Sequence, residues 1–166
     1  MIKIRNSVFE TNSSSTHSIS IRGGNPDRTP EFNSLGKYID EDNYLHIKFM
    51  EFGWGYDSYN DAYTKLVYLI QMICLTHGID PWWQEKSSEY IMKDLNDVNE
   101  WEWINNCIRK WYNIEGIYID SVDGYIDHQS YEYYRSAKDF LNAYELTIEE
   151  FLFNPNVKLI IDNDNH

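Results

Sequence analysis

Length, composition and charge restrict the classes of protein to which this chain can belong. It has 166 residues, and its 27 acidic and 14 basic residues give a formal net charge of −13. We expect one domain over residues 1–166. Hydrophobic residues make up 42% of the chain and aromatic residues 16%, which excludes an acidic disordered protein. The pI near 4.6 argues against direct nucleic-acid binding and favours basic protein partners.

The chain shows no feature typical of secretion or of a membrane span. Cys74 and Cys107 stand in apolar helical patterns, where thiols pack as small core residues and form no disulfide framework. The longest apolar stretch, residues 66–75, is too short for a bilayer core of about 30 Å. We therefore expect a cytoplasmic protein with no membrane partner.

Hydrophobic periodicity predicts strands first and then helices. Alternating residues predict strands at residues 2–5, 18–22 and 44–49, with a surface loop over residues 23–34. Helical spacing follows at residues 60–77, where Gly78 marks the end. A second helix is expected at residues 80–95, with Asp80 as its N-cap and Pro81 at its first helical position, and a third at residues 99–112.

The remainder of the chain returns to strands and short helices. Residues 116–120 and 125–127 predict a hairpin with Asp123-Gly124 at its turn. Short helices are expected at residues 136–144 and from Thr147, which with Glu150 matches a capping box. Residues 157–161 predict a last strand. The order indicates an α+β fold with a largely antiparallel sheet packed against a helical middle segment.

The first candidate site is a hydroxyl-rich segment that ends on an imidazole. Hydroxyls and a histidine supply a nucleophile and a base, or contacts to an anion. The alternative is that these side chains cap backbone groups in a tight loop, with the histidine hydrogen-bonded in the core. The segment comprises Ser13, Ser14, Ser15, Thr16, His17 and Ser18.

Two further polar segments extend the candidate site. Asp127, His128, Gln129 and Ser130 follow a predicted strand, where neighbouring Asp and His side chains point to opposite faces and form no triad. The chain ends in an oxygen-rich segment that lacks the Gly and distal Glu of a calcium loop, so no metal and no cofactor is expected. Secondary candidates are Trp54, Asp162, Asn163 and Asp164.

Four motifs resemble a family of small phage and bacterial proteins. The most specific is Phe-Glu-Thr-Asn-Ser-Ser-Ser-Thr-His-Ser at residues 9–18. The others are Phe-Gly-Trp at 52–54, Tyr-Ile-Asp-His-Gln-Ser at 125–130, and Phe-Leu-Phe-Asn at 151–154 with Asp-Asn-Asp-Asn at 162–165. The resemblance implies a phage or prophage source, hence the bacterial host cytoplasm, and candidate site residues without a reaction.

Two functions remain open from the sequence. The first is a phage accessory protein, similar in action to anti-CRISPR proteins, that inhibits a host defence system by binding one component and blocking its basic nucleic-acid cleft. Its acidic charge and its supply of tyrosine and tryptophan suit such an interface. The alternative is a small enzyme or nucleotide-binding protein with a polar Ser/His/Asp pocket, so whether the chain is an enzyme stays open.

The pocket alternative makes a geometric prediction. An antiparallel sheet that contains both an N-terminal and a C-terminal strand brings the polar ends of the chain together. We expect His17 and His128 to share one pocket, with Ser15, Ser18, Asp127 and Ser130 nearby.

Overall fold

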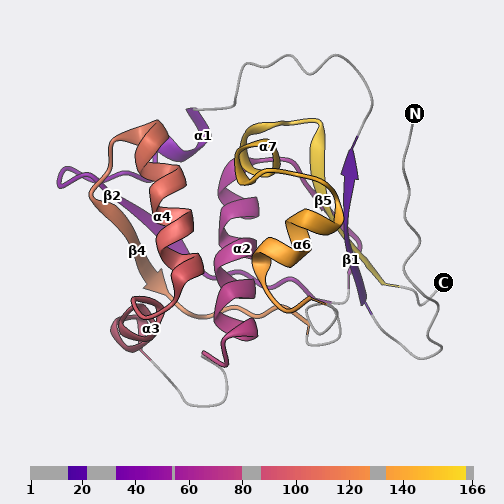
Figure 1. The fold of residues 1–166 in the computed structure, drawn as a ribbon, viewed down its shortest axis with the longest axis horizontal. Coiled ribbons are helices and arrows are strands. Elements are labelled where there is room, and N and C mark those ends of the chain that lie inside the picture. Colours follow the sequence, from indigo (N-terminus) through magenta and orange to yellow (C-terminus); the bar gives the residue numbers. More distant parts are fainter. Residues whose placement is uncertain (1–14, 22–32, 54, 80–86, 128–133, 164–166) are drawn as a thin grey trace.

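The fold is α+β, as the sequence predicts (Figure 1). The computed structural model describes residues 15–21, 33–53, 55–79, 87–127 and 134–163. The strands are β1 (Ser15–Ile21), β2 (Tyr44–Lys48), β3 (Asp57–Tyr59), β4 (Gly116–Ser121) and β5 (Val157–Asn163). The helices are α1 (Asn33–Gly36), α2 (Ala62–Thr76), α3 (Ser88–Leu95), α4 (Asn99–Tyr112), α6 (Ala137–Ala143) and α7 (Ile148–Phe153).

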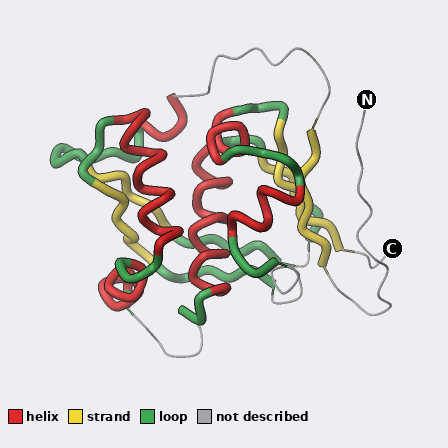
Figure 2. Tube along the Cα trace, in the orientation of Figure 1, coloured by secondary structure: helices red, strands yellow, loops and turns green. Residues whose placement is uncertain are grey.

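The strands form two separate sheets on opposite sides of α2 (Figures 1 and 2). One sheet is antiparallel with the strand order β1–β5–β3, and the other is the parallel pair β2–β4. The expectation of a largely antiparallel sheet therefore describes only the first of them. A parallel pair needs a long crossover connection, and the chain supplies one by placing α2, α3 and α4 between β2 and β4.

Helix α2 lies at the centre of the core. Every residue from Thr64 to Cys74 is buried, and apolar side chains of both sheets pack in the same core cluster. Burying a Leu or Ile side chain contributes about 1.5–3 kcal/mol, so this helix accounts for a large part of the folding free energy. The predicted boundaries are confirmed: Asp61 caps the start by accepting from the Thr64 N–H at 2.8 Å, and Gly78 follows the end at φ 70°.

Two polar residues of α2 are buried and bind backbone groups of other segments. The Lys65 ammonium donates to the carbonyls of Asn154 at 3.2 Å and Val157 at 3.1 Å, between α7 and β5. The Gln71 amide accepts from the Met50 N–H at 2.8 Å and donates to the Met50 carbonyl at 2.9 Å. Because buried polar groups are costly unless paired, these bonds fix both connections against α2.

The predicted hairpin around Asp123-Gly124 is wrong. Strand β4 pairs with β2 in parallel, and beyond the glycine Ile126 forms a parallel bridge with Phe52. The chain thus continues beside the same neighbouring segment instead of turning back. Gly124 permits this course, because a β-carbon there would lie 2.4 Å from the backbone nitrogen of Met50.

The remaining predicted elements are confirmed where the structure describes them. Helices α4, α6 and α7 match the expected ranges, and the capping box of Thr147 and Glu150 is present. The strand expected at residues 2–5 and the first part of the helix expected at 80–95 lie outside the described residues. The described part of that helix is α3, which begins at the N-cap Ser87.

Two short elements, α1 and β3, were not predicted, because each is too brief for a periodic pattern. Helix α1 begins at Asn33, so the loop expected over residues 23–34 is wrong at its last two residues. Over the described part of the chain, no helix is long and apolar enough to cross a membrane.

Candidate functional site

The polar segments near the two ends of the chain meet in the antiparallel sheet. Strand β1 pairs with β5 so that Ser15 lies opposite Asn163 and Thr16 lies opposite Asp162. The expected meeting of the two polar segments is confirmed for these four residues. Asp162 and Asn163 belong to the regular strand and are not a loose tail.

Seven of the expected site residues lie outside the described part of the chain: Ser13, Ser14, Trp54, His128, Gln129, Ser130 and Asp164. The shared pocket of His17 and His128 therefore stays a prediction. Of the other expected neighbours, Ser18 is opposite Ile160 in the β1–β5 register.

His17 is a buried side chain with a partner on α2. Its exposed fraction is 5%, and its Nδ1 lies 3.0 Å from the Tyr68 hydroxyl. Burial lowers the pKa of His17 from 6.5 to about 4, and the carboxylate of Asp127 opposes this shift. His17 is thus a neutral imidazole at physiological pH.

The carboxylate of Asp127, another expected site residue, lies near enough to His17 to raise its pKa against the effect of burial. Asp127 is itself buried, and its backbone N–H donates to the Phe52 carbonyl at 3.0 Å. The Tyr68 ring packs edge-on against the Phe52 ring, with centroids 5.0 Å apart, and burial raises the pKa of Tyr68 well above 10. This polar cluster is embedded among core aromatic rings, an environment that favours the structural interpretation of His17.

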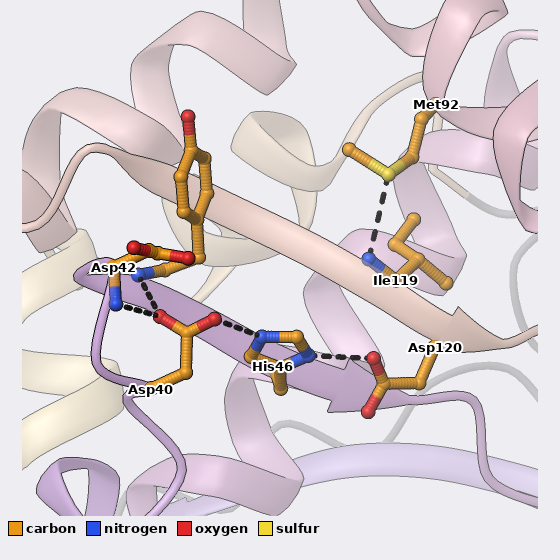
Figure 3. Close-up of polar contacts among 7 residues, drawn as sticks. Asp40, Asp42, His46, Met92, Ile119 and Asp120 are labelled. Atoms are coloured by element: carbon orange, nitrogen blue, oxygen red, sulfur yellow. Dashed lines mark hydrogen bonds and ion pairs between the residues drawn. The ribbon is translucent and has the colours of Figure 1, made fainter.

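A second polar site lies at the surface on the parallel sheet, and the sequence analysis missed it. His46 on β2 bridges two carboxylates: its Nδ1 lies 2.6 Å from Asp120 on β4, and its Nε2 lies 2.8 Å from Asp40 (Figure 3). Ionised carboxylates only accept hydrogen bonds, so both ring nitrogens of His46 donate and the ring is an imidazolium. These two bonds raise the pKa of His46.

Backbone groups fix the position of Asp40. Its Oδ1 accepts from the N–H groups of Tyr44 at 2.8 Å and Asp42 at 3.0 Å, in the turn that leads into β2 (Figure 3). These bonds and the bond to His46 lower the pKa of Asp40. The carboxylate is therefore held ionised in one orientation.

Two exposed tyrosines flank this bridged histidine. Tyr44 is 41% exposed and Tyr118 is 38% exposed, and the rings of His46 and Tyr118 have centroids 5.4 Å apart. We call this surface the tyrosine–aspartate face. It consists of Asp40, Tyr44, His46, Tyr118 and Asp120.

Strand alternation places Tyr44 and His46 of β2 and Tyr118 and Asp120 of β4 on one side of the sheet and the apolar side chains on the other. Leu45, Ile47, Ile117 and Ile119 are buried in the core. The alternation of Tyr44, His46 and Lys48 was visible in the sequence. The pairing of β2 with β4 was not visible, because no local sequence pattern specifies which distant strand will pair with β2.

Neither site offers a ready metal centre. Among the described residues, no group of three or more His, Cys, Asp or Glu side chains is placed to hold a metal ion. Both nitrogens of His46 already bind carboxylates.

Comparison of the chain with protein-family models, with curated proteins and with solved structures finds no match.

Proposed function

We propose that the protein is an acidic phage accessory protein that inhibits a host defence system by binding one component and covering its basic nucleic-acid cleft. The observation that supports this most is the tyrosine–aspartate face. Parallel sheets are usually covered on both faces, yet the outer face of β2–β4 exposes Tyr44 and Tyr118. Exposed tyrosines beside fixed carboxylates are the chemistry of an interface that binds cations.

The charge around this face supports a basic partner. Segments 37–48 and 115–123 contain the acidic residues Asp40, Glu41, Asp42, Glu115, Asp120 and Asp123, against Lys37 and Lys48. With the net charge of −13, this excess attracts a basic cleft over several ångströms and speeds association at low salt. The resemblance of the N-terminal motif to phage proteins suggests the source.

The environment of His17 supports binding over catalysis. A general base needs access to substrate, whereas His17 is buried and its Nδ1 is engaged by Tyr68. Its pKa near 4 also makes it a weak base. The inhibitor proposal needs no reaction and hence no such group.

A second candidate function, a nucleotide-binding protein, is favoured by one observation. The backbone register of β1 and β5 places Ser15 opposite Asn163 and Thr16 opposite Asp162. Hydroxyls and amides suit the ribose and phosphate of a nucleotide. A thermal-shift panel of nucleotides with divalent cations tests this candidate, because a ligand of the folded state raises the melting temperature by mass action.

Cleavage assays test the inhibitor proposal. A panel of purified RNA-guided nucleases and other nucleic-acid enzymes with basic clefts is assayed with and without the protein at equimolar ratio. We expect at least one enzyme to lose nucleic-acid binding stoichiometrically, with the effect weakening as salt rises. Undiminished cleavage by every enzyme, with no complex on size-exclusion chromatography, overturns the proposal.

A further inference from the structure

We propose that the tyrosine–aspartate face is the docking surface, and that its occupant is an arginine-bearing segment of a basic protein partner. The guanidinium groups stack on Tyr44 and Tyr118 and donate to the carboxylates of Asp40 and Asp120. The inference rests on the proposed function, which supplies the class of partner, a basic protein. It adds the surface at which this partner docks and the chemical group that is recognised, the guanidinium.

The first argument is the pairing of aromatic and acidic groups. Guanidinium planes stack on tyrosine rings and donate to carboxylates in a fork, which an ammonium cannot do. Tyr44 and Tyr118 present exposed rings, Asp40 and Asp120 bind the two ring nitrogens of His46, and His46 lies opposite Tyr118 in the β2–β4 register. Arginine therefore fits this face better than lysine.

The chain itself shows a cation on a tyrosine beside this face. Lys37 Nζ lies 4.9 Å from the centroid of the Tyr38 ring, and Tyr38 stacks on Tyr63 with centroids 3.9 Å apart. The Tyr38 carbonyl accepts from the His46 N–H at 2.8 Å, and the Tyr63 hydroxyl accepts from the Lys48 N–H at 3.0 Å. The stack thus borders β2, and both of its rings are half-buried against the core.

The second argument is that the acceptors are already fixed before binding. Two backbone N–H groups hold Asp40, and the His46 ring holds both carboxylates. Asp120 uses Oδ1 for His46, and a carboxylate accepts up to about four hydrogen bonds, so it can take a guanidinium as well. Fixed acceptors lose little entropy on binding, which raises affinity.

The occupant meets the face of the sheet and not its outer edge. Side chains cap that edge of β4: Met92 Sδ on α3 accepts from the Ile119 N–H at 3.5 Å (Figure 3), and Asn105 on α4 accepts from the Ile117 N–H at 3.2 Å. An added strand would have to displace both. Side-chain recognition on the open face needs no such displacement.

The cations near the face leave it acidic. Arg109, at the Gly116 end, donates to Glu102 and to the Glu115 carbonyl, so it is held by the chain itself. Lys37 lies over Tyr38. Lys48 is exposed at the end of β2. With Lys37, Lys48 and the imidazolium of His46 counted, three cations stand against the six acidic residues of segments 37–48 and 115–123, so the surroundings of the face stay negative for the incoming guanidinium.

Binding of a fluorescent arginine-rich peptide, measured by anisotropy, tests the inference. We expect the double variant Tyr44→Ala/Tyr118→Ala to weaken the affinity by about tenfold or more, which corresponds to about 1.4 kcal/mol. The control Tyr56→Ala removes a tyrosine that is 66% exposed outside this face, and we expect no more than about a twofold change. A lysine-for-arginine peptide should bind more weakly to the unaltered protein.

A second pair of variants guards against a folding defect in the first. Asp120→Asn keeps both tyrosines and should weaken the peptide, whereas Asp123→Asn removes the same charge beside Ser121 and should not. Equal losses in all variants and controls, or no loss in any, overturn the docking surface. Peptide binding at this face without inhibition of any basic-cleft enzyme overturns the proposed function and leaves the docking surface standing. Enzyme inhibition that survives Tyr44→Ala/Tyr118→Ala overturns the docking surface and leaves the proposed function standing.

Discussion

The hydroxyl of Tyr68 lies 3.0 Å from Nδ1 of His17, and this bond joins the centre of α2 to β1 across 51 positions of the sequence. The only histidine of the hydroxyl-rich N-terminal motif is thereby used to attach the antiparallel sheet to the central helix. The ring of His17 lies 5.7 Å from that of Tyr68, centroid to centroid, so the pair also packs. The contact predicts a stability that depends on the charge of His17.

Stability should fall as the pH decreases from about 6.5 to about 4. The folded-state pKa of His17, about 4, lies below the ordinary 6.5, so over this range the unfolded chain takes up a proton that the folded chain does not. The contribution of His17 is complete above pH 6.5 and is lost toward pH 4. Its size is about 3 kcal/mol.

Urea unfolding of the unaltered protein and of His17→Gln at several pH values measures this contribution. The carboxylates titrate in both proteins, so the difference between the two unfolding free energies isolates His17. Parallel pH profiles for the two proteins would contradict the buried, neutral state.

Local sequence signals were sufficient for helices α2, α4, α6 and α7 and for strands β1, β2, β4 and β5. The glycine at Gly78 and the capping box of Thr147 and Glu150 are short-range features, and each ends or begins a helix where predicted. Period-two alternation located β1 and β2 for the same reason. Each such signal acts within a few residues and does not depend on the rest of the fold.

Pairings between distant segments could not be predicted in the same way. The Asp123-Gly124 pair is a common hairpin signal, but here the glycine serves a close approach to Met50, a contact that only the folded chain reveals. His46 and Asp120 are 74 positions apart, and their contact follows from the parallel pairing of β2 with β4. The tyrosine–aspartate face was therefore beyond the reach of sequence patterns.

Gly124→Ala should destabilise the protein by about 1–3 kcal/mol or more. The new β-carbon would lie 2.4 Å from the nitrogen and 2.6 Å from the oxygen of Met50, and both are backbone atoms that Gln71 holds in place. Gly55→Ala is the matched control, because no atom of the described residues outside its chain neighbours lies within 4 Å of its β-carbon position. Thermal melts compare the two variants. Equal melting temperatures would show that the backbone does not approach at Gly124.

Lys65→Met should cost about 1–3 kcal/mol of unfolding free energy. The substitution keeps the apolar stem and removes the ammonium. The carbonyls of Asn154 and Val157 would then lose the hydrogen bonds that Lys65 donates to them. Lys110→Met is the control: Lys110 is an exposed lysine whose ammonium lies 3.5 Å from Glu149, a contact worth less than about 1 kcal/mol. Chemical denaturation measures both. A Lys65→Met protein as stable as the control would contradict the anchoring role of this lysine.

His46 should titrate above the ordinary histidine pKa of about 6.5. Hydrogen bonds to Asp120 and Asp40 favour the imidazolium, and Asp120→Asn removes the first of these charged acceptors, so the pKa should fall in that variant. Asp123→Asn should leave it almost unchanged. NMR titration of the imidazole proton resonances gives the three values, and a His46 pKa at or below 6.5 in the unaltered protein would refute the bridged geometry.

The most direct test compares inhibition per folded molecule in two variants, His17→Gln and Tyr44→Ala/Tyr118→Ala, against the enzyme that the nuclease panel identifies. The folded fraction of each is measured by circular dichroism under the assay conditions. We predict that His17→Gln lowers the melting temperature and inhibits normally once corrected for folding. The double tyrosine variant should melt like the unaltered protein and lose inhibition. Full inhibition by the folded double variant, together with its loss in folded His17→Gln, would contradict the account and place the function at the N-terminal motif.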